Sequence, residues 1–245
     1  MPQPNEIDST KVHLNMFAGH DNGRMRRIDN GRYMAEVLYP VLKPKTVIDL
    51  GCGLGFFLKA MANEGATVTA VDNDWVKDLQ TEVPKESYVF HDLNEPFKSQ
   101  KRFALATSFE VAEHLKPERS ESFVDDLCEL SNTVAFSAAI PGQGGSGHIN
   151  LRWQSDWVEM FSDRGYRCYD AIRPEISNKE DSYFWFRQNA FIFVKDGTRV
   201  PASVAGREIT ADAANQVCRN LYNRQFNRMR ARLQKLQERI KELEA

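Results

Sequence analysis

The sequence contains few cysteines, and none of them form a recognisable pair. Its four cysteines, at positions 52, 128, 168 and 218, are scattered without a CxxC motif. This spacing predicts neither a zinc ribbon nor a disulfide framework. We therefore expect the protein to work in a reducing cytoplasm, where free thiols persist.

Long apolar runs and a strong charge excess are also missing. No stretch of about 18 apolar residues is present, as a membrane span would need, and the first residues have no apolar core like that of a signal peptide. The chain has 32 Lys and Arg against 34 Asp and Glu, for a net charge of -2. We expect a protein that is neither exported nor membrane-spanning. Nucleic acid is not its first-choice partner, because no overall basic field is present.

The composition is that of an ordinary globular protein. The chain has 245 residues, of which 42% are hydrophobic and 27% charged, enough for one catalytic-sized domain and an appendage. We expect an N-terminal loop or lid over residues 1–32, a main domain over 33–200, a linker over 201–210 and a C-terminal helix over 211–245.

Apolar strands alternate with helical segments through the main domain. The first unit, residues 46–74, has a buried strand, a glycine-rich turn, a helix and a second strand, and it is a βαβ unit. Further strands are expected within 87–93, 103–110 and 133–140, with a helix over 120–132. Two terminal strands are expected within 166–172 and 188–196. This order predicts an α/β fold with a Rossmann-like, doubly wound and mostly parallel sheet that ends in an antiparallel pair.

The segment VIDLGCGLG places Gly51, Gly53 and Gly55 directly after the first strand. Glycines at such a turn let the backbone come close to a ligand that side chains would exclude. Asp72 ends the second strand, where a carboxylate can bind two ribose hydroxyls. Asp92 ends the third, where HDL suits recognition of an adenine amino group. These features predict a nucleoside-containing cofactor.

In this order and spacing, VIDLGCGLG, AVDND and HDL resemble the first three cofactor motifs of class I S-adenosylmethionine-dependent methyltransferases. The resemblance covers about residues 33–196 and implies S-adenosyl-L-methionine as the cofactor. An NAD-binding Rossmann enzyme would instead have G-x-G-x-x-G, whereas position 56 is Phe. The resemblance implies that the three glycines surround the methionine and ribose and that Asp72 holds the ribose. It also implies that Asp92 and Leu93 recognise the adenine and that Asp49 supports the loop or the cofactor amino group. The implied cofactor-binding set is Asp49, Gly51, Cys52, Gly53, Gly55, Asp72, Asn73, Asp92, Leu93 and Phe109.

The segment EVAEH follows the fourth strand. If a helix begins there, Glu110, Glu113 and His114 lie at i, i+3 and i+4 and point to one side. A glycine-rich loop after the fifth strand carries His148 to the same edge of the sheet. Oxygen and imidazole ligands of this kind suit Mg²⁺ or Mn²⁺, so these four residues are candidate metal ligands, and Glu113, His114 and His148 are candidate catalytic residues.

The pattern resembles the E-x-x-E-H and distant His of enzymes that methylate the 3'-terminal ribose of small RNAs. It partly resembles the E-x-x-E-H of ubiquinone-pathway catechol O-methyltransferases. Two other interpretations stay open: metal-free base catalysis by His114 or His148, and a structural role in which the acids favour a helix N-terminus.

The segment PGQGGSGHINLRW resembles the acceptor loop of bacterial methyltransferases that tailor sugars and glycans, although Leu151 stands where many members have Glu. Trp153, Trp157, Trp185 and Phe186 either stack on a sugar or pack in the core. The leading hypothesis is an O-methyltransferase acting on a hydroxyl of a sugar, glycan or related small metabolite. The alternatives are an RNA 3'-terminal ribose 2'-O-methyltransferase and a non-enzymatic, cofactor-binding scaffold.

The C-terminal segment shows a heptad pattern that predicts a coiled coil and a homo-oligomer. Arg239 would face Glu244 of a parallel partner. Alternatively, the helix packs back on its own domain, or its arginine-rich first half meets an anionic membrane face or nucleic acid. The seam consists of Tyr222, Phe226, Met229, Leu233, Leu236, Ile240 and Leu243.

Overall fold

The computed structural model describes residues 21–179 and 181–244. One eight-stranded sheet organises the domain, in the order β3-β2-β1-β4-β5-β7-β6-β8. The first five strands are parallel, and β7 pairs antiparallel with both β5 and β6. The strands are β1 (Thr46–Leu50), β2 (Thr67–Asp72), β3 (Tyr88–Phe90), β4 (Leu105–Phe109), β5 (Thr133–Ser137), β6 (Tyr166–Tyr169), β7 (Phe191–Lys195) and β8 (Glu208–Ile209). The predicted Rossmann-like sheet with its antiparallel end is confirmed.

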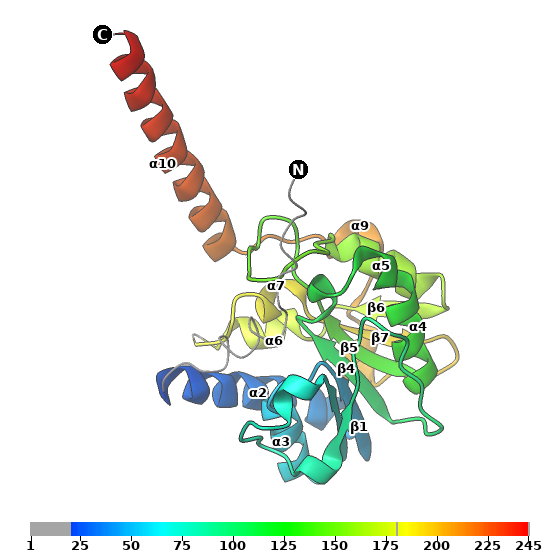
Figure 1. The fold of residues 1–245 in the computed structure, drawn as a ribbon. Helices are drawn as coiled ribbons and strands as arrows, with labels where there is room; N and C mark the ends of the chain where they lie inside the picture. Colours follow the sequence, from blue (N-terminus) through cyan, green and yellow to red (C-terminus); the bar gives the residue numbers. More distant parts are fainter. Residues whose placement is uncertain (1–20, 180, 245) are drawn as a thin grey trace.

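Helices cover both faces of the sheet (Figure 1). On one face lie α2 (Asp21–Leu42) and α3 (Phe56–Asn63), and on the other lie α4 (Ser120–Leu130) and α5 (Gln154–Ser162). The side chains of a strand point alternately to the two faces, so Val47 packs on the α2 side and its neighbour Ile48 on the α4 side. The core is therefore split into two layers by the sheet.

Several short elements and one long C-terminal helix complete the described part of the chain. The remaining helices are α6 (Arg173–Ser177), α7 (Phe186–Asn189), α8 (Ala202–Ala205), α9 (Ala211–Ala214) and α10 (Arg219–Glu244), and the 3₁₀ turns are η1 (Asp74–Val76), η2 (Lys85–Ser87), η3 (Ala112–His114) and η4 (Pro117–Arg119). Within the described ranges, no helix combines the length and the apolar character that a membrane crossing requires.

The N-terminal segment differs from the sequence prediction. Residues 1–20 of the expected loop lie outside the described residues, but residues 21–32 are the first half of α2 rather than a loop. At Gly31 this polar segment packs closely against the domain. A Cβ at Gly31 would lie 2.7 Å from the backbone carbonyl carbon of Phe56, so the glycine lets α2 pack closely against the start of α3.

The C-terminal segment also differs in two places. Residues 201–210, expected as a linker, contain α8 and β8, and β8 adds an edge to the sheet by pairing with β6. The helix expected from residue 211 is interrupted between α9 and α10. Hydrogen bonds hold this break in place: the backbone N–H of Ser155 donates to Asn215 Oδ1 at 2.9 Å, and that of Cys218 donates to Gln188 Oε1 at 2.8 Å.

Candidate active site

A cavity of about 400 Å³ opens at the carboxyl ends of the parallel strands. Its wall includes the glycine turn after β1, the end of β2, the residues after β3, the end of β4, part of α2 and the segment before α7. Doubly wound folds bind ligands at this edge. Nine of the ten predicted cofactor residues line the cavity: Asp49, Gly51, Cys52, Gly53, Asp72, Asn73, Asp92, Leu93 and Phe109.

The glycine turn is shaped by positive φ angles. Gly51 has φ 81°, and a Cβ there would lie 2.4 Å from Val111 Cγ2. Gly55 has φ 84° but does not line the cavity, because it is the residue at the N-terminal end of α3 and faces Val83 and Tyr88. Its role is to form the turn, whereas Gly51 and Gly53 expose backbone to the cavity.

Asp72 is buried at the end of β2, where backbone amides hold its carboxylate. The N–H of Gly53 donates to Oδ2 at 2.7 Å, and the N–H of Asn73 donates to Oδ1 at 2.8 Å. The glycine turn and the predicted ribose-binding acid are thus fixed to each other. This arrangement fits a ribose, because a buried, oriented carboxylate faces a cavity whose adjacent wall is glycine backbone.

Asp49 is a second buried acid under the same turn. Burial raises its pKa from 3.8 to about 7; a hydrogen bond from Thr107 Oγ1 at 2.7 Å opposes the rise, and the charge of Asp72 adds to it. A cationic group in the cavity would stabilise the ionised form. The amino group of a methionine-type cofactor has that chemistry.

Glu110 does not join its expected partners on one helix face. It has φ 56°, and the backbone then forms the 3₁₀ turn η3 instead of an α-helix. Its carboxylate accepts hydrogen bonds from Gln143 Nε2 at 2.7 Å and Asn189 Nδ2 at 3.1 Å. Glu110 lines the cavity, but it lies outside the group of close metal-ligand candidates.

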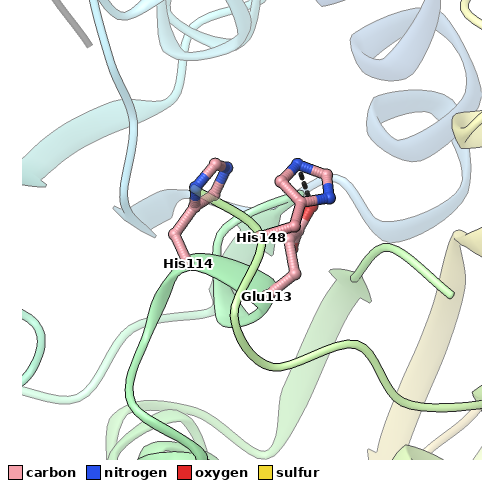
Figure 2. Close-up of side chains that lie close together, drawn as sticks. All are labelled: Glu113, His114 and His148. Carbon is pink, nitrogen blue, oxygen red and sulfur yellow. Dashed lines mark ion pairs between the residues drawn. The ribbon is translucent and has the colours of Figure 1, made fainter. Parts of the chain in front are cut away.

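Glu113, His114 and His148 do come together (Figure 2). One candidate ligand atom from each residue lies within 4.8 Å of the other two. The two imidazole rings meet edge to face with centroids 4.7 Å apart, and His148 Nε2 lies 4.0 Å from Glu113 Oε1. Of the three residues, His114 lines the cavity and the other two do not.

The Glu113 carboxylate is fully buried, and neither oxygen forms a hydrogen bond of normal geometry with the described residues. Burial raises its pKa well above the ordinary value, and Glu110 adds to the rise. The nearby backbone N–H groups of Glu113 and Ala139 oppose it. Nδ1 of His148 is buried without a hydrogen-bond partner in the same described part, and burial lowers the pKa of this imidazole. An unsatisfied carboxylate beside two imidazoles fits a divalent cation, which would satisfy these atoms.

The loop that carries His148 is anchored to the EVAEH turn. The backbone N–H groups of Ile149 and Asn150 donate to Glu113 O at 2.9 and 3.0 Å. Beside the imidazole lies Gly145, where a Cβ would be 2.1 Å from His148 Nε2. A bare backbone at this position leaves the space that the imidazole ring occupies.

Comparison with known proteins agrees with this geometry. Residues 25–137 match a family model described as a methyltransferase domain. Residues 25–137 are thereby identified as a methyltransferase domain, and the fold is that of the class I S-adenosylmethionine-dependent methyltransferases. A comparison with curated proteins gave no match.

Solved structures show the same fold as the methyltransferase at low sequence identity. DesVI of Streptomyces venezuelae is 14% identical, with 78% of this chain and 99% of that chain covered and a TM-score of 0.53. Magnesium protoporphyrin IX methyltransferase of Synechocystis PCC 6803, with bound SAH, is 14% identical over 77% and 95%, with a TM-score of 0.54. Phosphoethanolamine N-methyltransferase 1 of Haemonchus contortus is 17% identical over 94% and 55%, with a TM-score of 0.52.

Several cavity residues of the methyltransferase were not predicted. Arg27, Asn30, Gly31 and Met34 reach the cavity from α2. Sequence reasoning missed them because it placed the first three in a loop. A glycine within an otherwise helical pattern, at Gly31, was the available signal of close packing.

The aromatic residues divide between core and cavity. Trp157 is buried in the core beside Phe136, and Trp153 is 40% exposed outside the cavity. Trp185 and Phe186 line the cavity of the methyltransferase together with Tyr183, and the rings of Tyr183 and Trp185 stack with centroids 4.2 Å apart. The core interpretation holds for Trp157, and stacking on a sugar stays a prediction for Trp185 and Phe186.

Proposed function

We propose that the methyltransferase transfers a methyl group to a hydroxyl oxygen of a sugar, glycan or related small metabolite, with the assistance of a divalent metal such as Mg²⁺ or Mn²⁺. The observation that carries this proposal is the cluster of Glu113, His114 and His148, placed where His114 meets the cofactor-sized cavity. A cofactor site next to a candidate metal site matches the needs of a reaction that must deprotonate and position a hydroxyl.

In this proposal the glycine turn and the buried acids Asp49 and Asp72 provide the cofactor site. We assign the ribose to Asp72, the adenine to Asp92 and Leu93, and the amino group to Asp49. The turn residues Gly51 and Gly53 approach the methionine portion with backbone. Gly55 acts by shaping this turn, and the remaining proposed contacts are Cys52, Asn73 and Phe109.

Glu113, His114 and His148 would hold the metal, and His114 connects this cluster to the cavity. When bound, a divalent cation supplies positive charge that lowers the pKa of an acceptor hydroxyl. The depressed pKa of His148 keeps its imidazole neutral near physiological pH, which is the form that binds a metal or accepts a proton. Glu110, held by Gln143 and Asn189, also lines the cavity, where it would bind a polar group of the acceptor.

The aromatic wall supports a ring-shaped acceptor. Tyr183, Trp185 and Phe186 line the cavity, and aromatic side chains of this kind can stack on a sugar ring. Arg27 adds a cation at the same cavity, and this charge suits an acceptor carrying a phosphate. The cavity thus suits a small acceptor that carries a sugar ring and a phosphate.

The terminal ribose of an RNA is the second candidate acceptor. It also has adjacent hydroxyls, which the same three-residue cluster would engage through a metal. The net charge of -2 favours the small-molecule acceptor, because it gives no overall attraction for a polyanion. The two candidates share the catalytic cluster and differ in what the cavity entrance must bind.

Methyl transfer from labelled S-adenosylmethionine tests the proposal. The acceptors are nucleotide sugars, glycan fragments and a short RNA, which is compared with the same RNA lacking its terminal 2'-hydroxyl. We expect a methyl ether on a small acceptor and loss of activity with a chelator or with Glu113→Gln. The matched control is Glu118→Gln on the exposed turn η4, which should stay active.

A product methylated on nitrogen would contradict oxygen methylation. Activity that survives both chelation and Glu113→Gln would contradict metal assistance and favour metal-free base catalysis by a histidine. Transfer only to the RNA with an intact terminal ribose would favour the second candidate.

A further inference from the structure

Helix α10 carries an apolar stripe that the described part of the chain leaves uncovered. Seven side chains along it are 49% to 78% exposed, and they are spaced alternately four and three residues apart. Figure 1 shows the helix projecting away from the domain. The stripe consists of Tyr222, Phe226, Met229, Leu233, Leu236, Ile240 and Leu243.

The domain supports only the first turns of α10. Leu221 is 2% exposed, whereas every described side chain from Phe226 onward is exposed. The helix has 26 residues, so at 1.5 Å per residue it is about 39 Å long. Because helices in water draw most of their stability from packing, this length calls for a partner. The heptad spacing identifies the partner as another helix of the same kind.

We propose that two copies of the chain pair through α10 in a parallel two-stranded coiled coil, and that this pairing holds the loop carrying His148 in place. The occupant of the stripe is then the same stripe on a second copy, because an apolar heptad seam is complementary to itself.

The flanking charges select the parallel orientation. In a parallel pair, Gln225 faces Arg230 of the second copy and Arg232 faces Gln237, so none of these pairs opposes like charges. The two antiparallel registers that bury most of the seam each place arginine against arginine. In one register, Arg232 faces Arg239 of the second copy. In the other, Arg232 faces Arg232 of the second copy and Arg230 faces Arg230. Such like-charge pairs disfavour the antiparallel orientation.

The base of α10 holds residues 141–149, which we call the acceptor loop. Arg224 Nη2 donates a hydrogen bond to the backbone oxygen of Gln143, and Gln225 Nε2 donates to that of Gly142. The Arg224 guanidinium also lies over the Phe184 ring, 5.2 Å from its centroid. The first two turns of the projecting helix are therefore attached to this loop.

The other side of the acceptor loop reaches the active site. The Gln143 side chain is buried and donates to Glu110, and Gly145 lies against the His148 ring. Loss of helix in α10 would release the loop on its outer side. The consequence for metal binding rests on the proposed function, whereas pairing and loop ordering do not.

Light scattering on the full chain tests the pairing. We expect twice the chain mass of 28.1 kDa for the wild type and for Gln234→Lys, which adds a charge outside the seam. Leu236→Lys adds the same charge within the seam and should give a single chain. A wild type that is monomeric, or an L236K variant of unchanged mass, would overturn the proposal and leave the stripe to a different partner.

Cysteine cross-linking tests the orientation. Leu243→Cys places thiols at one seam layer near the free end, where a parallel pair brings them together. We expect oxidation to link this variant into a covalent dimer, with no link in the wild type or in Glu242→Cys. Cross-linking of Leu243→Cys only after mixing with Phe226→Cys, its layer partner in the antiparallel register that sets Arg232 against Arg239, would indicate antiparallel pairing and overturn the parallel assignment.

Hydrogen exchange tests the coupling without reference to activity. Backbone amides of the acceptor loop should exchange on the order of tenfold faster in Leu236→Lys than in Gln234→Lys, because local opening becomes less costly once α10 is unpaired. Unchanged exchange in a monomeric Leu236→Lys variant would refute the coupling. If exchange and mass change but Mn²⁺ affinity does not, the pairing orders the loop without controlling the metal site; if the wild type binds no Mn²⁺, the proposed metal site fails while the paired loop stands.

Discussion

Asp49 is expected to make cofactor binding depend on pH. Its carboxyl group is buried under the glycine turn with a pKa of about 7, and the cause is burial, with a smaller contribution from Asp72. S-Adenosylmethionine brings positive charge to this region in the proposed binding mode. A neighbouring cation favours the ionised carboxylate, so binding near neutral pH should release a proton from Asp49.

The magnitude follows from linkage. If the bound cofactor returns the pKa to about 4, affinity at about pH 5 is on the order of 100-fold lower than at about pH 8, or roughly 2.7 kcal/mol. The pH dependence of folding stability has the opposite sign to that of cofactor affinity. Because the folded pKa of this acid is raised above its unfolded value, ionisation of Asp49 destabilises the cofactor-free fold, and stability from this group increases as pH falls from about 7 towards about 4.

Calorimetric titration of S-adenosylmethionine between about pH 5 and pH 8 measures the affinity at each pH. Repeating it in buffers of different ionisation enthalpy measures the number of protons released on binding. Asp49→Asn is the matched variant, because it keeps the size and the acceptor oxygen for Thr107 but cannot titrate. We expect steep pH dependence in the wild type and much less in the variant. Equal slopes in the two proteins, or a flat profile in the wild type, would refute the assigned role of Asp49.

Three further changes probe the cofactor site, the cluster and the core. Asp72→Ala should weaken cofactor binding by about 2 to 4 kcal/mol in calorimetry, because charged hydrogen bonds are lost; unchanged affinity would exclude the ribose role. Gly145→Ala should displace the His148 ring, since the new Cβ would lie 2.1 Å from Nε2, and should lower Mn²⁺ affinity on the order of 10- to 100-fold. Unaltered Mn²⁺ binding would show that the ring position is not critical. Phe193→Ala removes a fully buried ring stacked on Phe161 at 4.0 Å. It should lower the free energy of unfolding, measured in urea, by about 3 to 5 kcal/mol, and an unchanged free energy of unfolding would contradict this.

The parallel sheet and its cofactor edge could be predicted from the sequence because their signals are local. The glycines after β1 and the acid ending β2 lie in one continuous βαβ unit, and that unit fixes where they meet. The encounter of His114 and His148 was also predictable, since β4 and β5 are adjacent and parallel and both residues follow their carboxyl ends.

Long-range packing decided the features that could not be predicted. The polar first half of α2 is helical in a domain where Gly31 allows its close contact with α3. Glu110 was expected on a helix face with Glu113, but its left-handed backbone turns its side chain towards Gln143 and Asn189, which are distant in sequence. Local periodicity carries no information about either contact.

The short β8 and the break before α10 have the same explanation. β8 is only two residues long and forms by pairing with β6, so it leaves little pattern in the sequence. The break is held by the hydrogen bond that the Cys218 N–H donates to Gln188, a residue that lies 30 positions earlier in the chain.

The most direct test of the metal-assisted account is calorimetric titration of Mn²⁺ into protein saturated with S-adenosylhomocysteine. The wild type is compared with Glu113→Gln and His148→Ala, and Glu118→Gln serves as the matched control. The account predicts binding in the wild type and the control and its loss in both cluster variants. A wild type that does not bind Mn²⁺, or cluster variants that bind as well as the control, would contradict it.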